Sequence, residues 1–161
     1  MLNSVVLTYP NPRKPYILHI DASNLALGAT LSQEDENGNL RLISCGSRKL
    51  SPAEKNYPAH EKECLALVDT LQRWRHYIHG APQVIVYTDN LTLKYLTTMK
   101  DTSPRMNRWL EKLQRFNFEI RHIPGTTKTA TDALSRNLSL CPLKTEDLLH
   151  AYRLSTHKMV H

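Results

Sequence analysis

The hydrophobic pattern opens with three strand-like runs. Residues 16–21 alternate between two faces and end at Asp21. A second run places every other residue from Leu25 to Leu31 on one apolar face, and a third covers about 40–46. Between the second and third runs, Asn37-Gly38 indicates a hairpin, because both central residues of such a turn tolerate positive φ. We therefore expect an antiparallel meander.

The pattern then becomes helical. After Pro58, apolar residues recur at helical spacing to about His79, where Gly80 and Pro82 end the segment. Residues 84–87 form a continuous apolar run, which is typical of a strand covered on both faces and ends at Thr88-Asp89. Further segments follow in the order short helix (91–96), helix beginning at Ser103-Pro104, strand (118–122) and last helix from about 129.

This order predicts the fold class. Hairpin strands followed by alternating helices and strands indicate an α/β chain with a mixed sheet and helices on both faces. We expect one domain over residues 1–136, with its core at about 15–136. Residues 137–161 are polar and are interpreted as a C-terminal linker or tail.

Charge adds a class of partner. The chain of 161 residues carries 21 Lys and Arg against 15 Asp and Glu, a net charge of +6, which favours an anionic partner such as nucleic acid. A merely soluble basic surface is the alternative. The predicted helix after Ser103 carries a basic stripe made of Arg105, Arg108, Lys112 and Arg115. This stripe is either a candidate nucleic-acid contact or an ordinary solvated helix face. No apolar run approaches the roughly 18 residues of a membrane span.

Two aspartates end predicted strands. Asp21 ends the first strand and Asp89 ends the most apolar one. Sites in open α/β sheets gather at the carboxyl ends of strands, and two neighbouring carboxylates repel unless a cation lies between them. Mg²⁺ suits such oxygen ligands. The alternative is that each aspartate caps the following element, which applies best to Asp89 because it precedes a predicted helix.

Periodicity alone does not choose a third acid. Glu61 and Glu63 flank the apolar stripe of their helix at about equal angles, on opposite sides. Asp132, near the start of the last predicted helix, is a fourth candidate, although an acid is also favourable in any first helical turn.

Several motifs, taken together and in order, resemble a known family. They are YILHIDAS (16–23), LGATLSQ (27–33), NYPAHEKECLAL (56–67), WRHYIHG (74–80), YTDN (87–90) and DALSR (132–136). This set resembles the ribonuclease H domain of gypsy-class (Metaviridae) LTR-retrotransposon reverse transcriptases, over about residues 7–136. Several ordered motifs are far more specific than one short pattern.

The resemblance implies a ribonuclease H-like fold and hydrolysis of the RNA strand of RNA–DNA hybrids. It also implies that Asp21, Glu63, Asp89 and Asp132 hold two Mg²⁺ ions, with Mn²⁺ as a substitute. Glu63 is preferred to Glu61 because it immediately precedes CLAL in the motif, so the choice comes from the resemblance.

The resemblance further implies partners and a setting. The partners are the RNA–DNA hybrid and the polymerase domain of the same polyprotein, without a membrane, inside cytoplasmic virus-like particles. The basic stripe is the candidate contact for the hybrid, and His60 and Asn24, near the acids in the sequence, are weaker candidates. The oligomeric state stays open.

The chain departs from the usual family pattern in places. Asn90 stands where the family usually has histidine, and the loop 124–130 lacks the mobile histidine of cellular and retroviral relatives, since His122 lies earlier. The alternative function is therefore a catalytically weak or inactive module that binds hybrid or serves as a structural domain. An integrase-type nuclease is rejected, because the position where that class needs a glutamate is Pro124.

Overall fold

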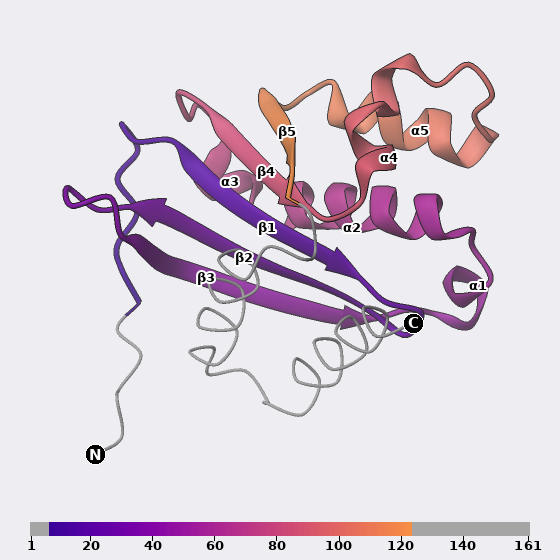
Figure 1. Ribbon diagram of the computed structural model, residues 1–161, viewed down its shortest axis with the longest axis horizontal. Helices are drawn as coiled ribbons and strands as arrows, with labels where there is room; N and C mark the ends of the chain where they lie inside the picture. Colours follow the sequence, from indigo (N-terminus) through magenta and orange to yellow (C-terminus); the bar gives the residue numbers. More distant parts are fainter. Residues whose placement is uncertain (1–6, 124–161) are drawn as a thin grey trace.

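The computed structural model describes residues 7–123, built around one five-stranded mixed sheet in the order β3-β2-β1-β4-β5 (Figure 1). Strands β1 (Tyr16–Ala22), β2 (Ala26–Glu34) and β3 (Leu40–Lys49) form the expected antiparallel meander. Strand β4 (Val84–Thr88) runs parallel to β1, and β5 (Phe118–His122) runs parallel to β4. The predicted α/β fold class and mixed sheet are confirmed.

The β2–β3 hairpin lies where the sequence predicts it, but its turn differs. Gly38 has a φ of 78°, whereas Asn37 does not adopt positive φ. The Gly38 N–H donates to the Asp35 carbonyl oxygen at 3.2 Å, and the Asp35 carboxylate accepts the N–H groups of Asn37 and Asn39 at 2.9 Å. The aspartate side chain therefore organises a turn in which a single glycine supplies the left-handed residue.

Helix α2 (Ala59–Arg73) packs its apolar stripe on β1 and β2. The buried core joins this stripe to the inward faces of the strands and includes Leu18, Leu31, Cys64, Leu67, Leu71 and Val86. The predicted single helix to His79 is wrong in one respect. Trp74, with φ −102° and ψ 19°, interrupts it, and a separate turn α3 (Arg75–Ile78) follows.

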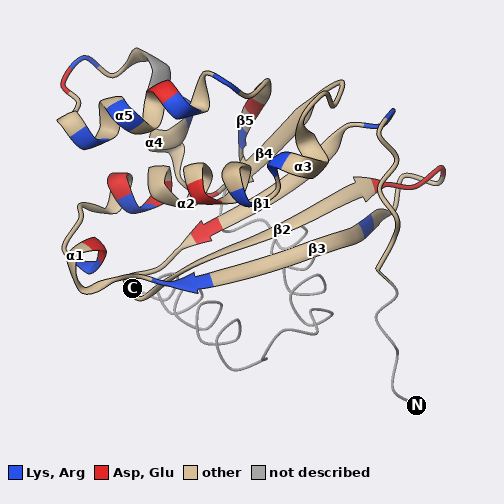
Figure 2. Ribbon diagram, turned by 180° about the vertical axis from the view of Figure 1, so that it is seen from behind, with Lys and Arg blue, Asp and Glu red and all other residues tan. Residues whose placement is uncertain are grey.

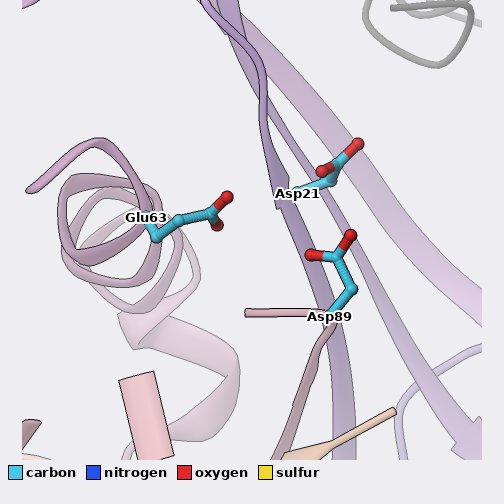
Figure 3. A group of neighbouring side chains, drawn as sticks. All are labelled: Asp21, Glu63 and Asp89. Carbon is cyan, nitrogen blue, oxygen red and sulfur yellow. The ribbon is translucent and has the colours of Figure 1, made fainter. Parts of the chain in front are cut away.

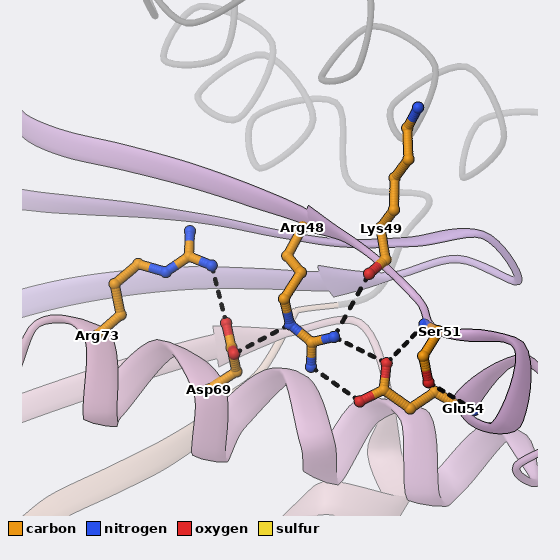
Figure 4. Close-up of polar contacts among 6 residues, drawn as sticks. All are labelled: Arg48, Lys49, Ser51, Glu54, Asp69 and Arg73. Atoms are coloured by element: carbon orange, nitrogen blue, oxygen red, sulfur yellow. Dashed lines mark hydrogen bonds and ion pairs between the residues drawn. The ribbon is translucent and has the colours of Figure 1, made fainter.

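A short helix that the sequence analysis did not predict, α1 (Pro52–Lys55), precedes α2. Ser51 and Glu54 form a reciprocal capping box, a signal that the sequence contains. Figure 4 shows Glu54 also pairing with Arg48 at 2.7 Å, while Arg48 bonds Asp69 at 3.1 Å. This network fastens the end of β3 to both helices.

The remaining described helices complete one side of the sheet. They are α4 (Leu91–Lys94), the 3-10 turn η1 (Leu96–Thr98) and α5 (Pro104–Leu113), with α4 and α5 lying against α2 (Figures 1 and 2). Ser103 caps α5 as predicted, accepting the Met106 N–H at 3.2 Å. No helix in residues 7–123 is both long enough and apolar enough to cross a membrane. The helix expected from about 129 and the boundary at 136 lie outside the described residues.

A buried carboxylate joins α2 to α5. Glu61 is 5 % exposed, and it accepts hydrogen bonds from Ser103 Oγ at 2.7 Å and from Arg105 Nη1 at 2.6 Å. The Arg105 guanidinium also lies 3.7 Å from the centre of the Tyr57 ring. Burial alone would raise the pKa of Glu61, but the hydrogen bonds from Ser103 and Arg105 and the charge of Arg105 hold this pKa below its usual value.

Replacing this carboxylate tests the α2–α5 contact. We expect Glu61→Gln to lower the free energy of unfolding by about 1.5–3 kcal/mol at neutral pH, the usual worth of hydrogen bonds to a charged group. Because the folded-state pKa of Glu61 is lowered, its contribution is complete above its ordinary pKa of 4.5 and is lost as the pH falls through the lowered value. Urea unfolding of both proteins at several pH values should show the difference shrinking below pH 4.5.

Glu119→Gln is the matched control, because the ion pair of Glu119 with Arg121 is exposed and its loss should leave stability unchanged. Equal unfolding curves for Glu61→Gln and the wild-type chain would show that the contact of Glu61 with Ser103 and Arg105 does not stabilise the fold.

Candidate functional site

Three carboxylates converge at one edge of the sheet. Asp21 is the penultimate residue of β1, Asp89 directly follows β4, and Glu63 projects from α2 toward both (Figure 3). Each residue offers a carboxylate oxygen, and these oxygens all lie within 4.8 Å of one another. The parallel pairing of β1 with β4 explains the convergence, because it ends both strands at the same edge.

The three carboxylates differ in exposure. Glu63 is 8 % exposed, Asp21 is half-buried, and Asp89 is exposed. The site is therefore enclosed on the side of α2 and open to solvent at Asp89.

Asp89 is not the N-cap of the helix that follows it. Asn90 is the N-cap of α4, and its side chain accepts the Thr92 N–H at 2.8 Å. The alternative that Asp89 caps this helix is wrong. The departure from the family pattern at Asn90 also has a local reason, because asparagine is among the best N-cap residues.

The structure also separates the two glutamates of α2. Glu61 faces α5 and is bound to Ser103 and Arg105, whereas Glu63 lies beside Asp21 and Asp89. The geometry thus agrees with the choice that the resemblance made and that periodicity left open. The fourth predicted ligand, Asp132, lies outside the described residues.

The donor set fits a hard divalent cation. Carboxylate oxygens this close repel one another, and a cation between them removes the repulsion. Oxygen-only ligands with an open, solvent-facing side match the preference of Mg²⁺, which keeps several waters and shares its coordination with phosphate. Function as metal ligands stays a prediction for all four acids.

The predicted nucleic-acid contacts fall into two groups. Arg108 and Lys112 are exposed on α5, and Arg115 is exposed just beyond the end of that helix. Arg105 differs, because its guanidinium is engaged with Glu61 and Tyr57. The basic stripe is thus not uniform, and three of its four members are available to an anionic partner.

The two weaker candidates lie near two of the carboxylates in the sequence. His60 is exposed in the first turn of α2, and Asn24 is exposed between β1 and β2. Asn24 Oδ1 accepts a hydrogen bond from Lys62 Nζ at 3.3 Å.

Sequence reasoning missed one residue that contacts the surroundings of the site and considered a second without giving it a role. Lys62 is one, and its contact with Asn24 joins residues 38 apart, which no local pattern reveals. His122 is the other, since its Nε2 lies 3.0 Å from the Asp89 carbonyl oxygen, to which it donates. The pairing of Thr88 with His122 in adjacent parallel strands is the signal that places this histidine there.

Comparisons with known proteins agree with this geometry. Residues 11–116 match the family described as the RNase H-like domain found in reverse transcriptase. The chain is 38 % identical over 136 residues to the retrovirus-related Pol polyprotein from transposon opus of Drosophila melanogaster, covering 84 % of this chain and 14 % of the polyprotein. The polyproteins of transposons 297 and gypsy from the same organism are 40 % and 34 % identical, covering 84 % and 82 % of this chain but 12 % of each relative. The chain thus spans a small part of these relatives.

Solved structures show the same fold at low sequence identity. The foamy viral protease-reverse transcriptase in complex with dsDNA superposes with a TM-score of 0.61 at 16 % identity, over 76 % of this chain and 26 % of that one. Its complex with RNA/DNA hybrid gives 0.54 at 18 % identity, over 76 % and 17 %. RNase H1 from Halobacterium salinarum gives 0.51 at 20 % identity, over 78 % and 98 %.

The family match, the retrotransposon relatives and the shared fold lead to one conclusion. This chain belongs to the family of RNase H-like domains found in reverse transcriptases, and it is similar to segments of retrotransposon Pol polyproteins.

Proposed function

We propose that this chain is a ribonuclease H that hydrolyses the RNA strand of RNA–DNA hybrids. The convergence of Asp21, Glu63 and Asp89 near the carboxyl ends of β1 and β4 carries this proposal, because three carboxylates this close, on a fold of this family, are suited to hold a divalent cation. A similar domain in a solved reverse transcriptase is part of a complex with RNA/DNA hybrid, which supports the choice of substrate.

We propose that Asp21, Glu63 and Asp89, together with Asp132, hold two Mg²⁺ ions, for which Mn²⁺ can substitute. The described part of this donor set consists of carboxylates alone, which fits hard cations. When bound, the ions activate the attacking water and stabilise the leaving oxygen.

The chain's own contribution is positional. Glu63 lies on a long helix packed against the sheet, and Asp21 lies on the central strand, so both are fixed before substrate arrives. The His122 hydrogen bond to the Asp89 carbonyl fixes the backbone of the exposed ligand. Such preorganised charge acts in the transition state without a reorganisation cost. In the reaction, a water oxygen bonds to phosphorus and the P–O3′ bond breaks, leaving a 5′-phosphate and a 3′-hydroxyl.

Substrate selection then rests on shape and charge. The site must accept any base, so recognition depends on the form of the hybrid and on the 2′-hydroxyl groups. Arg108, Lys112 and Arg115 are exposed and can contact phosphates, which gives affinity without sequence preference. We propose that the polymerase domain of the same polyprotein supplies further contacts, in line with the small share of the relatives that this chain spans.

Removing one ligand tests the catalytic proposal. We expect Asp89→Asn and Glu63→Gln each to lower the rate of RNA-strand cleavage in Mg²⁺ more than about 100-fold, since even residues behind metal ligands are worth 10–100-fold. Labelled RNA–DNA hybrid, with EDTA in a parallel sample, measures this loss. Calorimetric titration with Mn²⁺ should show weakened cation binding in the same variants.

Glu36→Gln is the control, because Glu36 is exposed in the β2–β3 turn and outside the carboxylate cluster. Cleavage that survives EDTA or Asp89→Asn would refute the metal site. Intact hybrid binding without cleavage by the wild-type chain would favour the inactive binding module instead. Without binding, the assay is repeated with the polymerase domain added.

Charge removal on α5 tests the phosphate contacts. We expect Arg108→Ala and Lys112→Ala each to weaken hybrid binding and to reduce the slope of log K against log salt concentration by about 1. Fluorescence anisotropy at several salt concentrations measures both quantities. Arg41→Ala is the control, because it removes the same charge beside the β2–β3 turn, which lies at the end of the sheet far from α5 (Figure 1). This variant should leave the salt slope unchanged. If Arg108→Ala and Lys112→Ala kept the wild-type salt slope, as Arg41→Ala should, α5 would be excluded from the interface with the hybrid.

A further inference from the structure

A buried lysine stands next to Glu63 in the sequence of helix α2. Lys62 is 7 % exposed and immediately precedes Glu63 on α2. Its ammonium bonds a neutral group, the Asn24 amide oxygen, at 3.3 Å. Burying an ammonium is costly and is ordinarily offset by an anionic partner. The hydrogen bond to a neutral amide therefore does not by itself account for the burial of the Lys62 ammonium.

The Lys62–Asn24 contact links helix α2, which carries Glu63, to the turn that follows Asp21. Asn24 follows Asp21 by three residues in the β1–β2 turn, and Lys62 lies next to Glu63. The backbone of the turn is independently fixed, because Ser23 Oγ accepts the Ala26 N–H at 2.9 Å and the Leu25 N–H at 3.2 Å. What remains adjustable is the exposed Asn24 side chain.

Lys62 fixes the direction of the Asn24 amide. An ammonium only donates hydrogen bonds, so it selects the orientation in which Oδ1 faces it. The opposite orientation would bring the amide NH₂ against the ammonium. With Oδ1 bound to Lys62 and the residue exposed, the two Nδ2 N–H donors are left for a ligand on the solvent side of the β1–β2 turn. Outward donors at this point match the acceptor oxygens of a sugar–phosphate backbone.

We propose that Lys62 is a positioning residue, which orients the Asn24 amide so that its N–H groups bind the backbone of the hybrid next to the cleavage site. This inference rests on the proposed function, because the hybrid is its ligand. Lys62 itself contacts no substrate, since its side chain is buried.

Hybrid binding by the purified chain tests this assignment, measured by anisotropy in Ca²⁺ at several salt concentrations. We expect Asn24→Ala and Lys62→Met each to weaken binding about 2- to 10-fold, the worth of one hydrogen bond. The double variant should bind no more weakly than either single one, because both changes remove the same contact. The salt slope should stay at the wild-type value, and the effect on cleavage should fall more on KM than on kcat.

Two further variants separate recognition from folding. Asn24→Asp keeps an acceptor for Lys62 but lacks N–H donors, so we expect an unchanged or higher melting temperature together with weakened hybrid binding. Lys62→Arg keeps a donor at this position and should recover binding relative to Lys62→Met.

The outcomes that overturn the inference are distinct. Additive effects in the double variant, or wild-type binding by Asn24→Asp, would show that the amide is not oriented for the hybrid. A salt slope lowered by about 1 in Lys62→Met would make Lys62 a direct phosphate contact instead. If the wild-type chain binds hybrid without cleaving it and the variants bind as expected, the catalytic proposal fails while this inference stands. A wild-type chain that binds no hybrid, either alone or with the polymerase domain added, overturns both.

Discussion

The parallel alignment of β1 with β4 is the constraint on which the site depends. Asp21 and Asp89 are separated by most of the described chain, yet both strands end at the same edge because they run in the same direction. An antiparallel pairing would place the two carboxylates at opposite edges of the sheet. A parallel pair requires a crossover, and α2 lies within that crossover. The connection that makes the pairing possible therefore also delivers Glu63.

Helix α2 uses two neighbouring acids for unrelated purposes. Glu61 and Glu63 are two residues apart, about 200° around the helix axis, so they face different neighbours. Glu61 holds α5 through Ser103 and Arg105, while Glu63 joins the strand carboxylates. The same helix thus fixes the carboxylate cluster and the element that carries Arg108 and Lys112. Helix α2, rather than a loop, therefore sets the distance between the carboxylate cluster and α5.

The sequence predicted the features that local periodicity controls. The strand alternation ending at Asp21, the apolar run ending before Asp89 and the Ser103 cap all have local causes, and each was located correctly. The helix break at Trp74 was missed because the apolar spacing continues through it.

Other features depend on contacts that periodicity does not encode. The turn type at Gly38 depends on the Asp35 side chain, and the choice between Glu61 and Glu63 depends on which strands and helices lie opposite. The contact of Lys62 with Asn24 is purely tertiary. A single sequence therefore predicts the helices and strands better than the side-chain contacts between them.

The unequal burial of the three carboxylates has one more consequence. Water screens the charge of exposed Asp89 but screens that of buried Glu63 poorly, so the negative potential deepens from the surface inward. A cation held by the three carboxylates, as proposed above, would therefore be attracted most strongly on the side of helix α2.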